Sequence, residues 1–193
     1  MFLMMQRANP RSTSLAAADE AAAEIQKPAR RTLRFESFDA IIADSRQLEL
    51  GYEQVGNWTL GQACDHLAKF MRYSMEGFPG RALPWPFSAV MRRIALSPRR
   101  IVRPMPPGLR TPKFLMPATV GPARDLRQAD HEAAARLVEM CRRVKHHGGE
   151  FYPSPLFGKL PPAMWRLVHL RHCELHLSFL VPSPMSRHEM RQG

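Results

Sequence analysis

Two histidines near the C-terminal end of the chain have a spacing that suits metal binding. His172 and His176 are four residues apart in a segment that predicts a helix from about residue 161 to 180. Because an α-helix has about 3.6 residues per turn, these side chains share one face, about one turn apart, and two imidazoles so placed can bind one ion. The spacing is equally compatible with two histidines that are hydrogen-bonded in a protein core. A metal site is therefore one of two interpretations of this pair.

The other residues of the predicted helix indicate which way the pair points. A projection at about 100° per residue places a largely apolar set within about 60° of His172. The members of this set are Trp165, Val168, His169, Leu175, His176 and Phe179. Arg171, Glu174 and Ser178 fall on another side, which we expect to face solvent. We therefore predict that the pair points into the core, where a neutral imidazole is costly to bury unless both nitrogens have partners.

Two further histidines could take part in such a site. His66 lies in a second predicted helix, at the edge of the face that carries Phe70 and Tyr73. In a helical bundle it can lie opposite the pair, which gives three nitrogen ligands and an open coordination position, as in catalytic metal sites. His169 lies one turn before His172, and we interpret it as a residue that orients a ligand or fills the core, with a role as fourth ligand as the alternative.

Four predicted helices would position these histidines. Apolar residues recur at three- and four-residue steps in segments that begin near Phe35, Thr59, Asp125 and Pro161, and Thr59 suits the N-cap of the second helix. No segment of the chain shows the alternation of polar and apolar residues that is typical of a β-strand. The predicted fold class is therefore all-α: a four-helix bundle over residues 35–180 with one long crossover between helices two and three.

The crossover, residues 77–124, has an unusual composition. It holds ten of the 18 prolines and nine positively charged residues of a chain with net charge +11, and it contains no Asp or Glu. Only residues 86–96 predict a short helix. Connections of this length are usually functional or disordered. We interpret the segment as a binding loop or lid, in which Arg103, Arg110 and Lys113 are candidates to bind an anionic substrate.

Composition also sets expectations for the ends of the chain and for its location. Residues 1–34 and 181–193 are predicted to be disordered tails. The three cysteines have no CxxC spacing, so they predict neither a disulfide framework nor a zinc finger, and a reducing cytoplasm fits them best. No segment approaches the roughly 18 apolar residues that a membrane-spanning helix requires. We therefore expect a cytoplasmic protein with no membrane partner.

Three stretches of the sequence resemble a known superfamily. They are NWTLGQACDHLAKFMRYSMEGFPG (57–80), LRTPKFLMP (109–117) and PLFGKLPPAMWRLVHLRHCELHLSFL (155–180). The chain is similar in these stretches, and over residues 35–180 as a whole, to an uncharacterised branch of the DinB/YfiT-like metalloenzyme superfamily. Members are four-helix bundles with one histidine on the second helix and an HxxxH pair on the fourth. By motif position the resemblance implies His66, His172 and His176 as the ligands of a divalent metal.

The match to this pattern is not complete, and it leaves the reaction open. Many relatives have a further histidine between the pair, where this chain has Leu175, and Ser154 stands where a histidine often precedes PxFG. The resemblance implies a thiol-dependent transferase or isomerase that acts on a small thiol or anionic substrate. Zinc or nickel is the first choice of metal, and iron or copper would also suit three histidines.

Two other functions remain open. One is a bundle that binds a metal without catalysis, in a regulatory role. The other is a basic nucleic-acid-binding or anion-binding module, because Trp85, Phe87 and Phe114 lie among the basic residues as base-stacking side chains would. The chain has no recognition-helix or sheet-based binding motif, which argues against nucleic acid as partner. A homodimer is compatible with either the enzyme or the regulatory protein.

Overall fold

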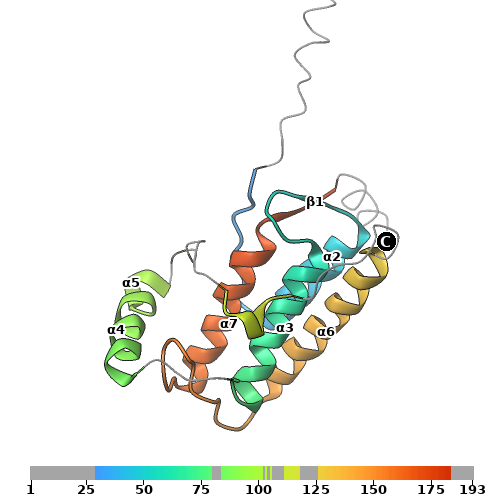
Figure 1. Ribbon diagram of the computed structural model, residues 1–193. Helices are drawn as coiled ribbons and strands as arrows, with labels where there is room; N and C mark the ends of the chain where they lie inside the picture. Colours follow the sequence, from blue (N-terminus) through green and yellow to red (C-terminus); the bar gives the residue numbers. More distant parts are fainter. Residues whose placement is uncertain are drawn as a thin grey trace, which may run out of the picture.

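Four long helices lie side by side in the computed structural model, which describes residues 29–79, 84–101, 103, 105, 111–117 and 126–183 (Figure 1). They are α2 (Phe38–Leu50), α3 (Leu60–Glu76), α6 (Leu126–His146) and α7 (Pro162–Leu177). Apolar side chains from all four helices form one hydrophobic core. The four helices predicted from the sequence are thus present, with bounds that differ by a few residues.

The ends of α2 and α3 follow from residues with clear capping roles. Ser37 accepts a hydrogen bond from the backbone N–H of Ala40 and so caps α2. Thr59 and Gln62 form a capping box at the start of α3, as the N-cap prediction for Thr59 requires. The helix then ends at Gly77, whose φ of 109° suits glycine. The segment that carries His66 is therefore a helix with a defined beginning and end.

A close contact between α3 and α6 sets the position of α3. A Cβ atom on Gly61 would lie 2.7 Å from Asp130 Oδ1, so only glycine lets the two helices approach this closely. The backbone N–H of Gly61 donates to that same oxygen at 2.6 Å, and the Tyr52 hydroxyl donates to Asp130 Oδ2 at 2.9 Å. Burial, with the Asp130 carboxylate nearby, raises the pKa of Tyr52 to about 12, so its hydroxyl remains a donor at neutral pH.

The structure corrects one part of the predicted fold class, because it contains a small β-sheet. Strands β1 (Tyr52–Gln54) and β2 (Leu180–Pro182) pair in antiparallel fashion, with Glu53 opposite Val181. Each strand has three residues, which is too short for an alternating pattern of polar and apolar residues to be recognised. The fold is therefore mostly helical, with one two-stranded sheet that joins the chain after α2 to the chain after α7.

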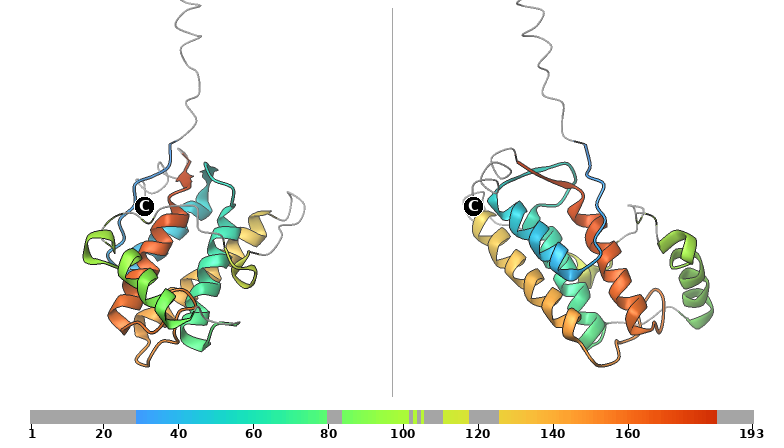
Figure 2. Two further views of the ribbon diagram at one scale, coloured as in Figure 1. Left: turned by 60° about the vertical axis from the view of Figure 1, so that its left-hand side comes forward. Right: turned by 180° about the vertical axis from the view of Figure 1, so that it is seen from behind.

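The described parts of the crossover form three short helices on two sides of the molecule. They are α4 (Trp85–Ala95), α5 (Pro98–Ile101) and the 3₁₀ helix η1 (Lys113–Leu115). The first matches the short helix predicted over residues 86–96. Helices α4 and α5 lie on the flank beyond α7, whereas η1 lies against α3 (Figure 2). The crossover therefore reaches both helices that carry the histidines.

The side of α7 that was predicted to face solvent is covered, and this prediction was wrong. Arg171 and Glu174 are each only 3% exposed. The extended chain before α2 lies over them: the backbone N–H of Phe35 donates to Glu174 Oε1 at 2.6 Å, and Arg171 donates to the Phe35 carbonyl at 3.2 Å. A helical projection shows which residues share a face, but not which other part of the chain covers it.

The two predicted tails are described only in part. Residues 29–34 belonged to the predicted N-terminal tail, yet they lie along α7, where the backbone N–H of Arg31 donates to the Ser178 carbonyl at 2.9 Å. Residues 181–183 of the predicted C-terminal tail complete and follow β2. The predictions for residues 1–28 and 184–193 lie outside the described residues.

None of the described helices is long and apolar enough to cross a membrane.

Candidate metal centre

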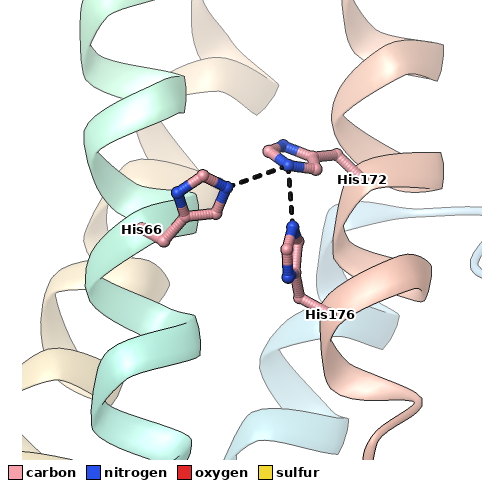
Figure 3. A group of neighbouring side chains, drawn as sticks. All are labelled: His66, His172 and His176. Atoms are coloured by element: carbon pink, nitrogen blue, oxygen red, sulfur yellow. Dashed lines mark hydrogen bonds between the residues drawn. The ribbon is translucent and has the colours of Figure 1, made fainter. Parts of the chain in front are cut away.

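The three histidines singled out from the sequence come together between α3 and α7 (Figure 3). His172 Nε2 lies 3.1 Å from His66 Nε2 and 3.0 Å from His176 Nε2. One ring nitrogen of each residue lies within 4.8 Å of the other two. Three nitrogen atoms from two helices therefore converge on one point.

All three imidazoles are expected to be neutral. Burial lowers the pKa of His66, and it lowers the pKa of His176 to about 3. The pKa of His172 lies well below its ordinary value, first because of burial and then because of the neighbouring histidines. A neutral imidazole has one N–H and one nitrogen lone pair, and the lone pair is what binds a metal ion.

The hydrogen bonds of His66 indicate which nitrogen carries its proton. His66 Nδ1 lies 2.8 Å from the backbone carbonyl of Leu115 in η1. A carbonyl oxygen can only accept, so Nδ1 carries the hydrogen and the Nε2 lone pair points at His172. Backbone carbonyls commonly orient metal-binding histidines in this way. A residue of the crossover thus holds His66 in the tautomer whose Nε2 lone pair faces the other two histidines.

The contacts among the three Nε2 atoms cannot all be satisfied by protons. If His172 Nε2 carries a hydrogen, that hydrogen cannot point along both lines, to His66 and to His176. If it carries none, its lone pair faces the lone pair of His66 Nε2. In addition, His172 Nδ1 is buried without a hydrogen-bond partner among the described residues. Hydrogen bonding therefore does not account for this arrangement of nitrogen atoms.

A single ion would account for it, because the geometry fits a shared metal. Two imidazole nitrogens at about 2.0–2.1 Å from a tetrahedral zinc ion are separated by about 3.3–3.4 Å. The observed separations of 3.0 and 3.1 Å are close to that value. The cluster is therefore compatible with a divalent ion bound by three neutral nitrogen ligands.

Aromatic rings enclose the cluster on two sides. The Trp58 ring stacks on His176, with centroids 5.0 Å apart and planes inclined by 13°, and it also contacts His66. The Phe70 ring meets His172 edge to face at 4.6 Å. No sequence pattern indicated a role for Trp58, because it precedes α3 and lies outside any helical pattern. The carbonyl of Leu115 was missed too, since a backbone atom carries no signal of residue type.

His169 lies in the core one turn away from the cluster and is not part of it. Its Nε2 is 3.0 Å from Ser74 Oγ, and its ring stacks on Trp165. The Ser74 hydroxyl donates to the Met71 carbonyl at 2.6 Å, so its oxygen accepts the proton of His169 Nε2. Burial lowers the pKa of His169 to about 3, so the ring is neutral. Of the roles considered for His169, the contacts match that of a core residue.

The three basic candidates for substrate binding are not seen at the cluster. Arg110 lies outside the described residues, and Arg103 and Lys113 are exposed. The link between the crossover and the site is made instead by backbone carbonyls of residues 115 and 116, which accept from His66 and Lys69. Part of the predicted lid thus contacts the site, but through its backbone.

The cysteines are placed as core residues. Cys64, Cys141 and Cys173 are buried free thiols. Burial raises the pKa of each, to about 12 for Cys141, so all three stay protonated at neutral pH. A protonated thiol is a poor metal ligand, which leaves the three histidines as the candidate donor set.

Comparisons with known proteins place the chain in a family. Neither the curated proteins nor the solved structures include a match to it. One family model matches residues 27–183, a range that includes both histidine-bearing helices and the crossover between them. The chain therefore belongs to the family described as "Protein of unknown function (DUF1569)".

Proposed function

We propose that this protein binds one divalent metal ion through Nε2 of His66, His172 and His176. The observation that carries the proposal is the convergence of these three nitrogen atoms, two of them 3.0 and 3.1 Å from the third. Neutral rings and the hydrogen bond from His66 Nδ1 to Leu115 support it, because both leave lone pairs directed at the common point. Zinc and nickel are the first candidates, and iron or copper would also suit three imidazoles.

We further propose that the four long helices form a DinB-like bundle. The histidine of α3 and the pair of α7 occupy the second and fourth long helices, which is the distribution that the resemblance implies. The long crossover falls between the second and third, again as expected for this chain. The proposal rests on the order of these elements together with the sequence motifs.

The number of protein ligands bears on the type of reaction. A metal ion bound by only three histidines would keep a fourth coordination position available for a substrate or water. A bound ion of this kind can act as a Lewis acid and lower the pKa of a coordinated thiol or water. His66 is buried, whereas His172 and His176 each keep part of the residue exposed to solvent. We propose a thiol-dependent transferase or isomerase, in which Trp58 and Phe70 provide apolar walls beside the reacting group.

A metal-binding protein without catalysis is the second candidate. The described residues show no carboxylate or further imidazole among the three histidines that could serve as a general base. A regulatory bundle would keep the ion and lack turnover. Turnover of an electrophile in the presence of small thiols, removed by chelation and restored by metal, would favour the enzyme.

The metal site itself is tested by metal content. Protein purified without a histidine tag should hold about one ion per chain by elemental analysis, and His66→Ala and His172→Ala should each lose it. His131→Ala is the matched control, because His131 is an exposed histidine of α6 that pairs with Glu49. Full retention of the ion in both ligand variants would refute the proposed site, and equal loss in the control would show that the assay reports adventitious binding.

The cysteine side chains are the basis for a proposed cellular location. Three cysteines that are all free and buried suit a reducing compartment, so we keep the cytoplasm as the proposed location.

A further inference from the structure

The outer side of α4 exposes a row of large apolar side chains. Phe87, Val90 and Ile94 are 64%, 56% and 52% exposed, and Trp85 at the start of the helix is 80% exposed. Single exposed apolar residues are ordinary on protein surfaces, but a contiguous set usually marks a contact site. We call Phe87, Val90 and Ile94 the α4 apolar stripe, whereas Trp85 lies about 140–180° around the helix from them.

The geometry of α4 places the stripe beside the residues that pack on the protein. At about 100° per residue, Phe87, Val90 and Ile94 fall within about 60° of one another. Ser88, which is buried, and Ala95, which packs against the core, lie about 110–130° around the helix from the middle of the stripe, and Met91 packs against the core between them and the stripe. The helix thus has one wide apolar face, of which one part packs on the protein and the stripe has no partner among the described residues.

Helix α4 is held in place, so the stripe has a fixed orientation. Arg92 donates to the Lys159 carbonyl at 3.1 Å, and a Cβ on Gly158 would lie 3.2 Å from Ser88 Oγ, which shows how closely helix and loop approach. Leu96 and Ile101, which follow the helix, are buried in the core. Both ends of the α4–α5 unit are therefore anchored, and the unit lies on the flank of the molecule (Figure 2).

Positive charge accompanies the stripe. Arg93 lies next to Ile94 on the exposed side, and Arg99, Arg100 and Arg103 follow within ten residues, all exposed. No Asp or Glu occurs in residues 77–124 to neutralise them. The α4–α5 region therefore combines an apolar stripe with exposed arginines that lack acidic neighbours in sequence.

We propose that α4 and α5 bind the surface of an anionic phospholipid bilayer. A helix that lies in a membrane interface has Trp, Phe or aliphatic residues on one side and arginines beside them, which is the composition found here. At about 1.5 Å per residue the 11 residues of α4 extend over about 16 Å, so the helix lies in the interface plane and does not span the bilayer. The proposal departs from the sequence-based prediction of no membrane partner; binding to a membrane surface requires no spanning helix, and none is present among the described residues.

A bilayer fits the stripe better than nucleic acid does. Val90 and Ile94 are aliphatic and cannot stack on bases, whereas they gain from transfer into the acyl boundary of a bilayer. Arginines beside them can pair with lipid phosphates at the same depth. This inference uses residues remote from the histidine cluster and stands independently of the proposed function.

The test is cosedimentation of the full chain with phosphatidylcholine vesicles that contain or lack phosphatidylserine. Binding should occur with the anionic vesicles at low salt and weaken as salt is added. In an Ile94→Trp/Trp85→Phe protein, tryptophan fluorescence should shift to shorter wavelength on binding, because the new indole lies in the stripe whereas Trp165 is already buried and Trp58 covers the histidines.

Two double variants separate the apolar and the ionic parts. Val90→Asp with Ile94→Asp should weaken vesicle binding at least about tenfold, since two charges would enter the apolar boundary. Arg93→Gln with Arg100→Gln should weaken it about fivefold for each arginine. Matched controls are Leu50→Asp, at a position 54% exposed on α2, and Arg136→Gln with Arg142→Gln on α6. The controls should bind as the natural protein does.

Several results would overturn the proposal. They are no cosedimentation with anionic vesicles at low salt, equal weakening in the control variants, and full binding by the Val90→Asp/Ile94→Asp protein when circular dichroism shows it folded. A self-associated protein that Ile94→Asp converts to monomer, without vesicle binding, would assign the stripe to a second copy of the chain. Salt-sensitive RNA binding in place of vesicle binding would assign it to nucleic acid.

Discussion

Helix α7 buries polar groups on two sides and satisfies them in different ways. On one side, Glu174 accepts from Arg171 and from the Phe35 backbone, with Arg34 at 3.9 Å, so charge is balanced within the chain. On the other side, His172 and His176 meet His66 with nitrogen atoms that hydrogen bonds cannot all satisfy. Both sides keep buried atoms without a hydrogen-bond partner, such as Glu174 Oε2 and His172 Nδ1, but only on the second side do three nitrogen atoms converge in a way compatible with a metal ion. This difference separates a structural polar cluster from a candidate site.

The largest effect on stability is expected from removing the buried ion pair between Glu174 and Arg171. Glu174→Ala should lower the free energy of unfolding by about 3–5 kcal/mol, because it leaves Arg171 buried without its partner. Asp39→Ala, which removes an exposed pair with Lys145, should cost less than about 1 kcal/mol. Urea denaturation of the metal-free proteins measures both. Similar small losses in the two variants would contradict the view that Glu174 stabilises the fold.

Metal addition should affect the histidine side alone. At a free metal concentration about 100 times the dissociation constant, the free energy of unfolding should rise by about 2.7 kcal/mol, because only the folded state holds three ligands together. Thermal denaturation with and without chelator measures this gain. Glu174→Gln should keep the gain and His172→Ala should lose it. A gain that survives in His172→Ala would place the metal elsewhere.

The pH dependence of stability tests the buried neutral histidines. A histidine whose folded pKa is about 3, against about 6.5 unfolded, contributes stability that is present above pH 6.5 and is lost as the pH falls, because the unfolded state takes up the proton first. For His169 the loss between pH 7 and pH 5 should be about 2 kcal/mol. His169→Gln, compared with the natural chain in the presence of chelator, should lack this part of the loss. An unchanged slope would show that His169 is protonated in the folded state.

The smallest effect is expected at the aromatic wall. Trp58→Ala should weaken metal binding by about 1 kcal/mol, or about fivefold in Kd, because the stacked ring no longer fixes His176. Trp58→Phe should recover most of the affinity. Competition with a chromogenic chelator measures both. Loss as complete as that of His176→Ala would mean that Trp58 does more than orient the ring.

The sequence was most informative where the pattern is local. The helical periods, the Thr59 cap and the HxxxH spacing each depend on residues within about one or two turns, and the structure has these helices and this shared face. The short helix at residues 86–96 was predicted for the same reason and is present as α4. Histidine and its spacing are also visible in sequence, so all three members of the cluster could be named in advance.

Other features depend on contacts between distant segments, and the sequence carries no local sign of them. Residues 29–35 cover Arg171 and Glu174, although more than 130 residues separate the two segments in the sequence. For this reason the side of α7 that was predicted to face solvent is buried. The two three-residue strands are stabilised only by pairing with each other. The same holds for Trp58 over His176 and for the Leu115 carbonyl at His66.

What the sequence determined by itself is therefore the four long helices, the short helix α4 and the candidate ligands, but not α5 or η1, because periodicity and residue chemistry are properties of short segments. The tertiary structure alone decided that the three Nε2 atoms meet, since that depends on the packing of α3 against α7. It also decided which buried polar residues form an ion pair and which converge as a group of nitrogen atoms. Burial and pairing are properties of the folded chain, so Glu174 pairs with Arg171 while His172, two residues away on the same helix, meets two other histidines.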